Sequence, residues 1–198
     1  MAQEIEIEYK NLLTKDEFER ILYSLPFPNG AQTQTNHYFE TADFSLKKNG
    51  CALRIREKNN TFTLTLKEPH DTGLLETHDT LTKPEAVQWI NGEFVAKEYT
   101  SKQLENKGIY LDDLKYFGSL TTKRRELNYQ DVLLVLDYSS YGDTSDYELE
   151  IEATSQEIGL KMMQDILEKF NIKQRQTPNK IQRFFSSKVN NDSNYSVE

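Results

Sequence analysis

Cysteine is nearly absent from this sequence, in which Cys51 is the single one among 198 residues. A chain with one cysteine cannot form an internal disulfide, and such usage is typical of a reducing cytoplasm. We expect Cys51 to be a small, buried hydrophobic residue. Histidine is also scarce, and the three that occur show no zinc-ligand spacing with one another or with Cys51, which disfavours a zinc site; they are His37, His70 and His78.

Long apolar runs are missing as well. No stretch of about eighteen apolar residues predicts a membrane span, and the N-terminus lacks the basic-then-apolar pattern of a signal peptide. These absences favour a cytoplasmic location. The net charge of −8 argues against non-specific binding to nucleic acid. We therefore expect neither a membrane nor a nucleic-acid partner, and the sequence does not indicate an oligomeric state.

Two hydrophobic periods alternate along the chain. A period of two predicts strands over residues 4–10, 35–40, 51–58, 61–68, 74–82, 116–127, 131–138 and 146–153, with a hairpin across Lys58-Asn59-Asn60. Capping-box spacing at Thr14 and Glu17, and again at Thr154 and Glu157, predicts two helix starts. Further helices are expected after Thr82, before Gly108 and after Pro178.

Eight strands joined by short connections or single helices can close into a barrel. We therefore predict an α+β fold, an eight-stranded antiparallel β-barrel forming a tunnel with a charged lumen and flanking helices. The length fits one domain over residues 1–188, and residues 189–198 read as a disordered C-terminal tail.

The strands carry an unusual charge pattern, with one apolar face and one face of mostly a single sign. The segment EIEIEYK, residues 4–10, places Glu4, Glu6, Glu8 and Lys10 on one side. Like charges side by side on a solvated face are mildly destabilising, without an evident benefit. The pattern indicates a barrel whose apolar faces pack beneath helices and whose charged faces line the lumen.

Both signs are present on these faces. The basic set suits several phosphate groups, because arginine gives bidentate contacts; it comprises Arg54, Arg56, Lys67, Lys123 and Arg125. The acidic set offers the hard oxygen ligands that Mg²⁺ or Mn²⁺ prefers; it comprises Glu6, Glu8, Asp137, Glu148 and Glu150. Acids and bases together are what metal-assisted phosphoryl transfer requires.

Five ordered motifs resemble the CYTH domain, or triphosphate tunnel metalloenzyme, family across roughly residues 3–185. They are the E-x-E-x-K signature at Glu6, Glu8 and Lys10, then YFETADFSLKKNGCALRIREK, TLTLKEP, TKRRE and YELEIE. NKIQRF near the end resembles a family segment that brings one more lysine, here Lys180, to the tunnel. The resemblance implies an eight-stranded barrel and a bound triphosphate held by basic residues and one or two divalent metals.

Carried over to this sequence, the resemblance assigns metal binding and catalysis to Glu6, Glu8, Asp137, Glu148 and Glu150. It assigns triphosphate binding to Lys10, Arg54, Arg56, Lys67, Lys123, Arg125 and Lys180. Glu4, Glu76 and Glu152 are additional candidates for acidic residues of the tunnel. Arg124 and Glu126 have the opposite parity and are expected to face outward.

The favoured function is hydrolysis of the terminal phosphate of a small triphosphate, with inorganic tripolyphosphate as the first choice. Class IV-type adenylate cyclase and thiamine triphosphatase activity are the enzymatic alternatives. A polyphosphate- or nucleotide-binding module without turnover is the alternative from another class, and metal-dependent turnover would separate it from an enzyme.

Overall fold

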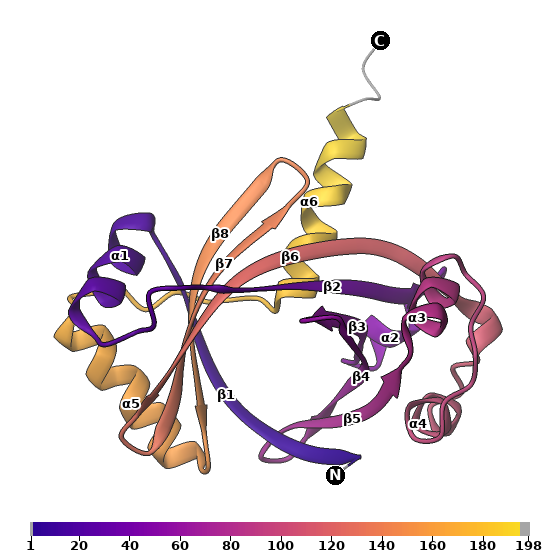
Figure 1. Cartoon of the computed structure of the whole chain (residues 1–198), viewed down its shortest axis with the longest axis horizontal. Helices are drawn as coiled ribbons and strands as arrows, with labels where there is room; N and C mark the ends of the chain where they lie inside the picture. Colours follow the sequence, from indigo (N-terminus) through magenta and orange to yellow (C-terminus); the bar gives the residue numbers. More distant parts are fainter. Residues whose placement is uncertain (1, 195–198) are drawn as a thin grey trace. The chain divides into compact units, whose positions relative to one another are not determined.

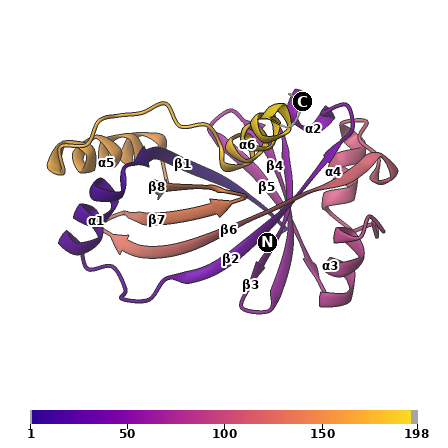
Figure 2. The same ribbon diagram turned by 90° about the horizontal axis from the view of Figure 1, so that it is seen from above.

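The structure is a computed structural model, and it describes residues 2–194, with side chains through Ser187. Eight antiparallel strands form a closed barrel in the order β1-β5-β4-β3-β2-β6-β7-β8, flanked by α-helices (Figures 1 and 2). This confirms the predicted fold class. The strands are β1 (Gln3–Leu13), β2 (Gln32–Thr41), β3 (Ala52–Lys58), β4 (Thr61–His70), β5 (Gly73–Leu81), β6 (Leu114–Tyr129), β7 (Val132–Tyr141) and β8 (Thr144–Ala153).

The α-helices are α1 (Lys15–Ser24), α2 (Ser45–Lys48), α3 (Lys83–Ile90), α4 (Thr100–Asn106), α5 (Gln156–Lys169) and α6 (Lys180–Asn194), with a 3₁₀ turn at Leu111–Asp113. Helix α6 thus extends into the segment expected to be a tail, and residues 195–198 lie outside the described residues. Across residues 2–194, none of the helices is both long and apolar enough to cross a membrane.

The hairpin between β3 and β4 is confirmed. Lys58 pairs with Thr61, and Asn59 and Asn60 both adopt positive φ angles, of 52° and 59°. Two successive left-handed residues make the turn that matches the twist of paired strands, and asparagine tolerates this conformation better than most residues.

Two helices begin at threonine caps, the first predicted as a capping box and the second predicted only as a helix start. Thr14 and Thr82 each cap a helix in a reciprocal capping box, with Glu17 and Glu85 respectively. The second predicted capping box, at Thr154 and Glu157, is wrong by one residue, because Ser155 is the residue that caps α5 and accepts the hydrogen bond from the backbone N–H of Ile158.

The chain divides into two compact units. Unit 1 contains the stretch up to Glu6 and Gln34–Ser119, and unit 2 contains Ile7–Thr33 and the stretch from Leu120 onward. In unit 1 the apolar faces of β3 and β4 pack beneath α3 and α4, around Trp89 and Leu104. In unit 2 the apolar faces of β7 and β8 pack against α1 and α5, around Ile21 and Ile166 (Figure 1).

Cys51 belongs to the core of unit 1, where it is 6% exposed. Burial raises the pKa of its thiol to about 11. The expectation of a small buried hydrophobic residue is confirmed, and each unit presents its charged strand faces on the side opposite to its helix-covered core.

Candidate metal- and phosphate-binding residues

Three carboxylates of unit 2 converge on one ammonium group. Asp137 on β7 pairs across the sheet with Glu148 on β8, and Glu150 lies two residues further along the same face of β8. Lys180, at the start of α6, places its Nζ 2.9 Å from Asp137, 2.6 Å from Glu148 and 2.5 Å from Glu150. Both Asp137 and Glu148 are fully buried, so their charges depend on these contacts.

Arg124 on β6 completes this cluster. Its Nε and Nη2 donate to the two carboxylate oxygens of Asp137 at 2.9 and 2.7 Å, and Nη2 also donates to Glu150 at 2.5 Å. A bidentate arginine–carboxylate pair is among the stronger charge-assisted contacts in proteins. Arg183 adds a further cation, with its Nη2 2.7 Å from Glu148 and its Nε 2.9 Å from Asp146.

The predicted parity of β6 is therefore wrong. Arg124 pairs across the sheet with Asp137, and Glu126 pairs with Val135, so both share the face of the acids. Lys123 and Arg125 pair with Tyr138 and Leu136 and belong to the opposite face, which is that of the core residues. A cation directly opposed to buried Asp137 compensates its charge, and the observed register supplies Arg124 in that position.

The carboxylates remain ionised because of their cationic neighbours. Burial by itself would raise the pKa of Glu150, but Lys180, Arg124 and Lys10 hold that pKa well below its usual range. Burial would likewise lower the pKa of Lys180, and Asp137, Glu150 and Glu148 hold it well above its usual range. The cluster consists of charged groups that stabilise one another.

The donor set of this cluster fits a divalent metal. Carboxylate oxygens are the ligands that Mg²⁺ and Mn²⁺ prefer, and the ammonium of Lys180 stands at the point where three of them meet. A site that holds one cation by three carboxylates has the chemistry to hold another. Asp137, Glu148 and Glu150 are thus brought together as the sequence predicted.

Two residues of the E-x-E-x-K signature also belong to unit 2. Lys10 pairs across the sheet with Glu150, Glu8 pairs with Glu152, and Lys10 Nζ lies 2.6 Å from Glu8. Glu152 lies 3.8 Å from Arg124 and its side chain is 32% exposed. All four residues lie on the strand face that carries the converging carboxylates.

Unit 1 has a charged group of its own. Lys67 on β4 forms ion pairs with Glu6 on β1 and Glu76 on β5. Burial would raise the pKa of Glu76, but Lys67 and Arg54 lower it to about 2. Arg54 and Arg56 share this strand face, and the Nε of Arg56 donates to Asn36 at 3.2 Å. Glu76, an additional acidic candidate from the sequence, is 5% exposed and forms an ion pair with Lys67.

Three residues of the two charged groups were not predicted from the sequence to belong to them. Arg124 was assigned to the wrong face, whereas Arg183 and His78 were given no role. Arg183 follows Lys180 by three residues in NKIQRF, so helical spacing could have placed both on one side of α6. His78 lies beside Glu76 and Glu4 in unit 1, while His37 contacts Tyr116 on the core side of β2.

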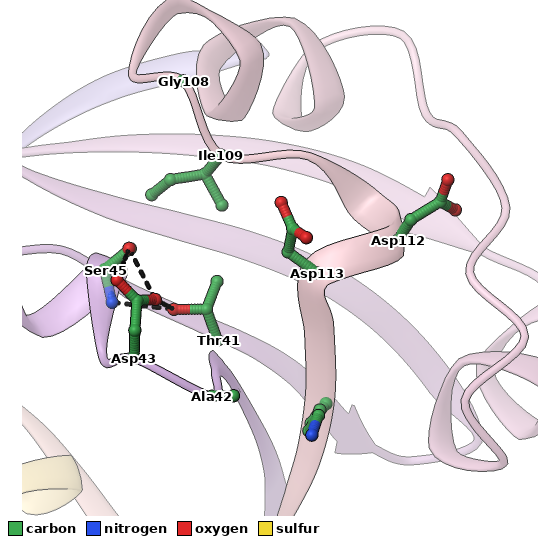
Figure 3. A pocket seen from close by; sticks show the side chains of 9 residues that line it. Thr41, Ala42, Asp43, Ser45, Gly108, Ile109, Asp112 and Asp113 are labelled. Carbon is green, nitrogen blue, oxygen red and sulfur yellow. Dashed lines mark hydrogen bonds between the residues drawn. The ribbon is translucent and has the colours of Figure 1, made fainter.

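A pocket of about 430 Å³ lies elsewhere in unit 1, between the start of α2 and the segment before β6 (Figure 3). The carboxylate of Asp43 accepts hydrogen bonds from the hydroxyl groups of Thr41 and Ser45, at 2.7 and 2.8 Å. Dashed lines mark hydrogen bonds among these residues in Figure 3. These bonds, with the ion pair to Lys48, lower the pKa of Asp43 and anchor the turn into α2. The pocket contains none of the predicted site residues.

Comparison with known proteins agrees with this arrangement. The family model described as "CYTH domain" matches residues 4–185. The chain is 46% identical over 189 residues to "Putative triphosphatase YjbK" of Bacillus subtilis (strain 168), covering 95% of this chain and 98% of that protein. The crystal structure of a "putative adenylate cyclase" from Bacillus halodurans is 48% identical, with a TM-score of 0.89 over 93% of this chain and 100% of that one.

A more distant structure, "Putative adenylyl cyclase HpAC1 from Hippeastrum", shares the fold at 23% identity. Its TM-score is 0.78, and the match covers 92% of this chain and 96% of that one. The family match spans both charged groups described above, together with all eight strands and the first turns of α6. This chain belongs to the CYTH domain family.

Proposed function

We propose that this protein is a divalent-metal-dependent triphosphatase that removes the terminal phosphate of a small triphosphate, with inorganic tripolyphosphate as its substrate. The observation that carries the proposal is the convergence of Asp137, Glu148 and Glu150 on a single cation position in unit 2. Family membership and the name of the Bacillus subtilis relative support the same reaction class.

In unit 2 the proposal assigns metal binding to the three converging carboxylates, with Glu8 as a further acid. Bound Mg²⁺ or Mn²⁺ would polarise phosphate oxygens and orient a water molecule. Lys10, Arg124 and Lys180 would bind phosphate oxygens, because each already holds a carboxylate through charge-assisted contacts.

In unit 1 the proposal assigns phosphate binding to Arg54, Arg56 and Lys67, and metal binding to Glu6. The buried Nε of Arg54 has no hydrogen-bond partner within the described residues, so a phosphate oxygen would satisfy a donor that otherwise costs free energy. Lys123 and Arg125 are not part of this assignment, because the register of β6 places them on the other face.

The reaction itself requires no covalent intermediate. A water oxygen attacks the terminal phosphorus, the bond from that phosphorus to the bridging oxygen breaks, and the water gives up a proton to solvent; the products are phosphate and diphosphate. Charge that develops on the leaving diphosphate is stabilised by fixed cations, which need no reorganisation during the reaction.

The experiment is to measure products from tripolyphosphate, thiamine triphosphate and ATP in parallel by ion chromatography, with Mg²⁺ or Mn²⁺ and with EDTA. Metal-dependent release of phosphate and diphosphate from tripolyphosphate supports the proposal. Cyclic AMP and diphosphate from ATP would instead show a cyclase, and faster cleavage of thiamine triphosphate would change the substrate. Tight tripolyphosphate binding without turnover would show a binding module.

A variant pair links the activity to the carboxylates. Glu150→Gln should lower the rate at least a hundredfold while the circular dichroism spectrum stays that of the parent. The matched control is Asp165→Asn, which removes an exposed carboxylate that pairs with Lys161 on α5 and should leave the rate unchanged. Equal rates in the two variants would remove Glu150 from the proposed site.

A further inference from the structure

A second group of potential metal ligands lies in unit 1. Glu4 on β1 pairs across the sheet with Glu76 on β5, and His78 follows Glu76 by two residues on the same face. The Nε2 of His78 lies 3.1 Å from a carboxylate oxygen of Glu4 and 3.3 Å from one of Glu76. One ligand atom from each residue falls within 4.8 Å of the others, so the three could share one ion.

The imidazole is held in the orientation that a metal ligand needs. Thr65 on β4 pairs across the sheet with His78, and its Oγ1 lies 3.0 Å from His78 Nδ1. When Nδ1–H donates to this oxygen, Nε2 carries the lone pair and points toward Glu4 and Glu76. Metal-binding histidines typically use their second nitrogen in this way.

The two separations measured from the Nε2 of His78 match the edges of a coordination sphere. Metal–nitrogen and metal–oxygen bonds of about 2.0–2.1 Å give tetrahedral edges of about 3.3 Å, and octahedral edges of about 3.0 Å. The distances from Nε2 of 3.1 and 3.3 Å lie between these values. An ion could therefore bridge His78 and either carboxylate without a large movement, and the two carboxylate oxygens lie within 4.8 Å of each other.

The local charge favours a divalent cation. Lys67 contacts one oxygen of Glu76, Oε1, whereas the other oxygen, Oε2, faces His78. Lys67 also pairs with Glu6, so this one ammonium serves two carboxylates while Glu4 adds a third. Glu4, Glu6 and Glu76 thus supply three carboxylates, and the cations beside them are Lys67 and Arg54.

We propose that Glu4, Glu76 and His78 form a binding site for a divalent transition metal, such as Mn²⁺ or Co²⁺, with one imidazole and two carboxylate ligands. The nitrogen ligand distinguishes this site from the all-carboxylate cluster of unit 2, since imidazole suits transition metals and Mg²⁺ favours oxygen. The proposal concerns metal binding alone and does not depend on the triphosphatase activity.

The test uses the full chain, stripped of metal and titrated with Mn²⁺ from one equivalent to saturation. Pulsed electron paramagnetic resonance detects the ¹⁴N coupling of an imidazole bound directly to Mn²⁺. The chain has only three histidines, so variants can assign that coupling. We expect coupling in the parent, its loss in His78→Gln, and its retention in the control His70→Gln, whose exposed ring is hydrogen-bonded to Thr72.

Two further variants keep the test decisive if His78→Gln fails to fold. Glu4 is exposed, so Glu4→Gln should be tolerated and should weaken Mn²⁺ binding at the nitrogen-coupled site about tenfold or more. Thr65→Val should weaken it by about 10- to 100-fold through loss of the imidazole's orienting partner. Absence of ¹⁴N coupling in the saturated parent, or its persistence in His78→Gln, would overturn the proposal.

Discussion

Replacing Arg124 by glutamine tests the buried charge cluster of unit 2 most directly. The substitution removes the bidentate pair with Asp137 and the contact with Glu150, both of which are almost inaccessible to solvent. Removing one partner of a buried pair usually costs about 3–5 kcal/mol of unfolding free energy, because the remaining charge is left uncompensated. Lys180 and Arg183 still neighbour the acids, so we expect about 3 kcal/mol, the lower end of that range.

The neighbouring residue supplies the matched control. Lys123 is exposed and lies on the opposite face of β6, so Lys123→Gln should change the unfolding free energy by no more than about 0.5 kcal/mol. With a urea dependence of about 2 kcal/mol per molar, Arg124→Gln should lower the urea midpoint by about 1.5 M. Circular dichroism follows both transitions, and equal midpoints would refute the assignment of Arg124 to the acid cluster.

The same variant should show a defined pH dependence. The folded-state pKa of Glu150 is depressed, so the stability gained from its ionisation is present above the unfolded pKa of about 4.3 and is lost as the pH falls below it. Arg124→Gln weakens that depression. The difference in unfolding free energy between parent and variant should therefore be largest near pH 7 and become smaller below about pH 4. A difference that stays constant with pH would contradict an electrostatic origin.

The structure predicts the direction of the change in stability or pKa for two other substitutions. Gly159→Ala should destabilise the protein by about 1–3 kcal/mol, because the added Cβ would lie 2.7 Å from the ring of Tyr9. Alanine normally stabilises a helix relative to glycine, so a higher melting temperature of the variant would contradict this prediction. Lys67→Met should raise the pKa of Glu76 from about 2, so the stability that its ionisation provides would be lost at a higher pH on acidification. Carboxyl ¹³C titration by NMR measures that pKa, and an unchanged value would exclude Lys67 as its cause.

The element order and the helix-covered faces could be predicted because they depend on local patterns. Period-two alternation predicted all eight strands, with ends that differ from the structure by up to three residues. The apolar faces of the strands pack beneath helices as expected, with Leu53, Ile55 and Leu64 in the core of unit 1. Several apolar residues on one face of a strand together determine which face is buried. A single misassigned position therefore does not change which face packs into the core.

Features that depend on partners distant in sequence could not be predicted in the same way. Glu4 and His78 are separated by 74 positions, and the pairing of β1 with β5 brings the ring toward Glu4. Motif spacing along the chain contains no such information. The start of α5 was missed for a local reason, since Thr154 and Ser155 are both good capping residues and the backbone selects between them.

The error on β6 shows what was needed to predict a binding face. Three consecutive cations, Lys123 to Arg125, occupy both faces of a strand, and Leu120 and Leu127 indicate opposite phases. The hairpin resolves this: a two-residue turn at Gln130-Asp131 pairs Tyr129 with Val132, and the same register pairs Arg124 with Asp137. A turn one residue longer or shorter would instead oppose Asp137 with Lys123 or Arg125. The length of one turn therefore decides which arginine can reach the acids.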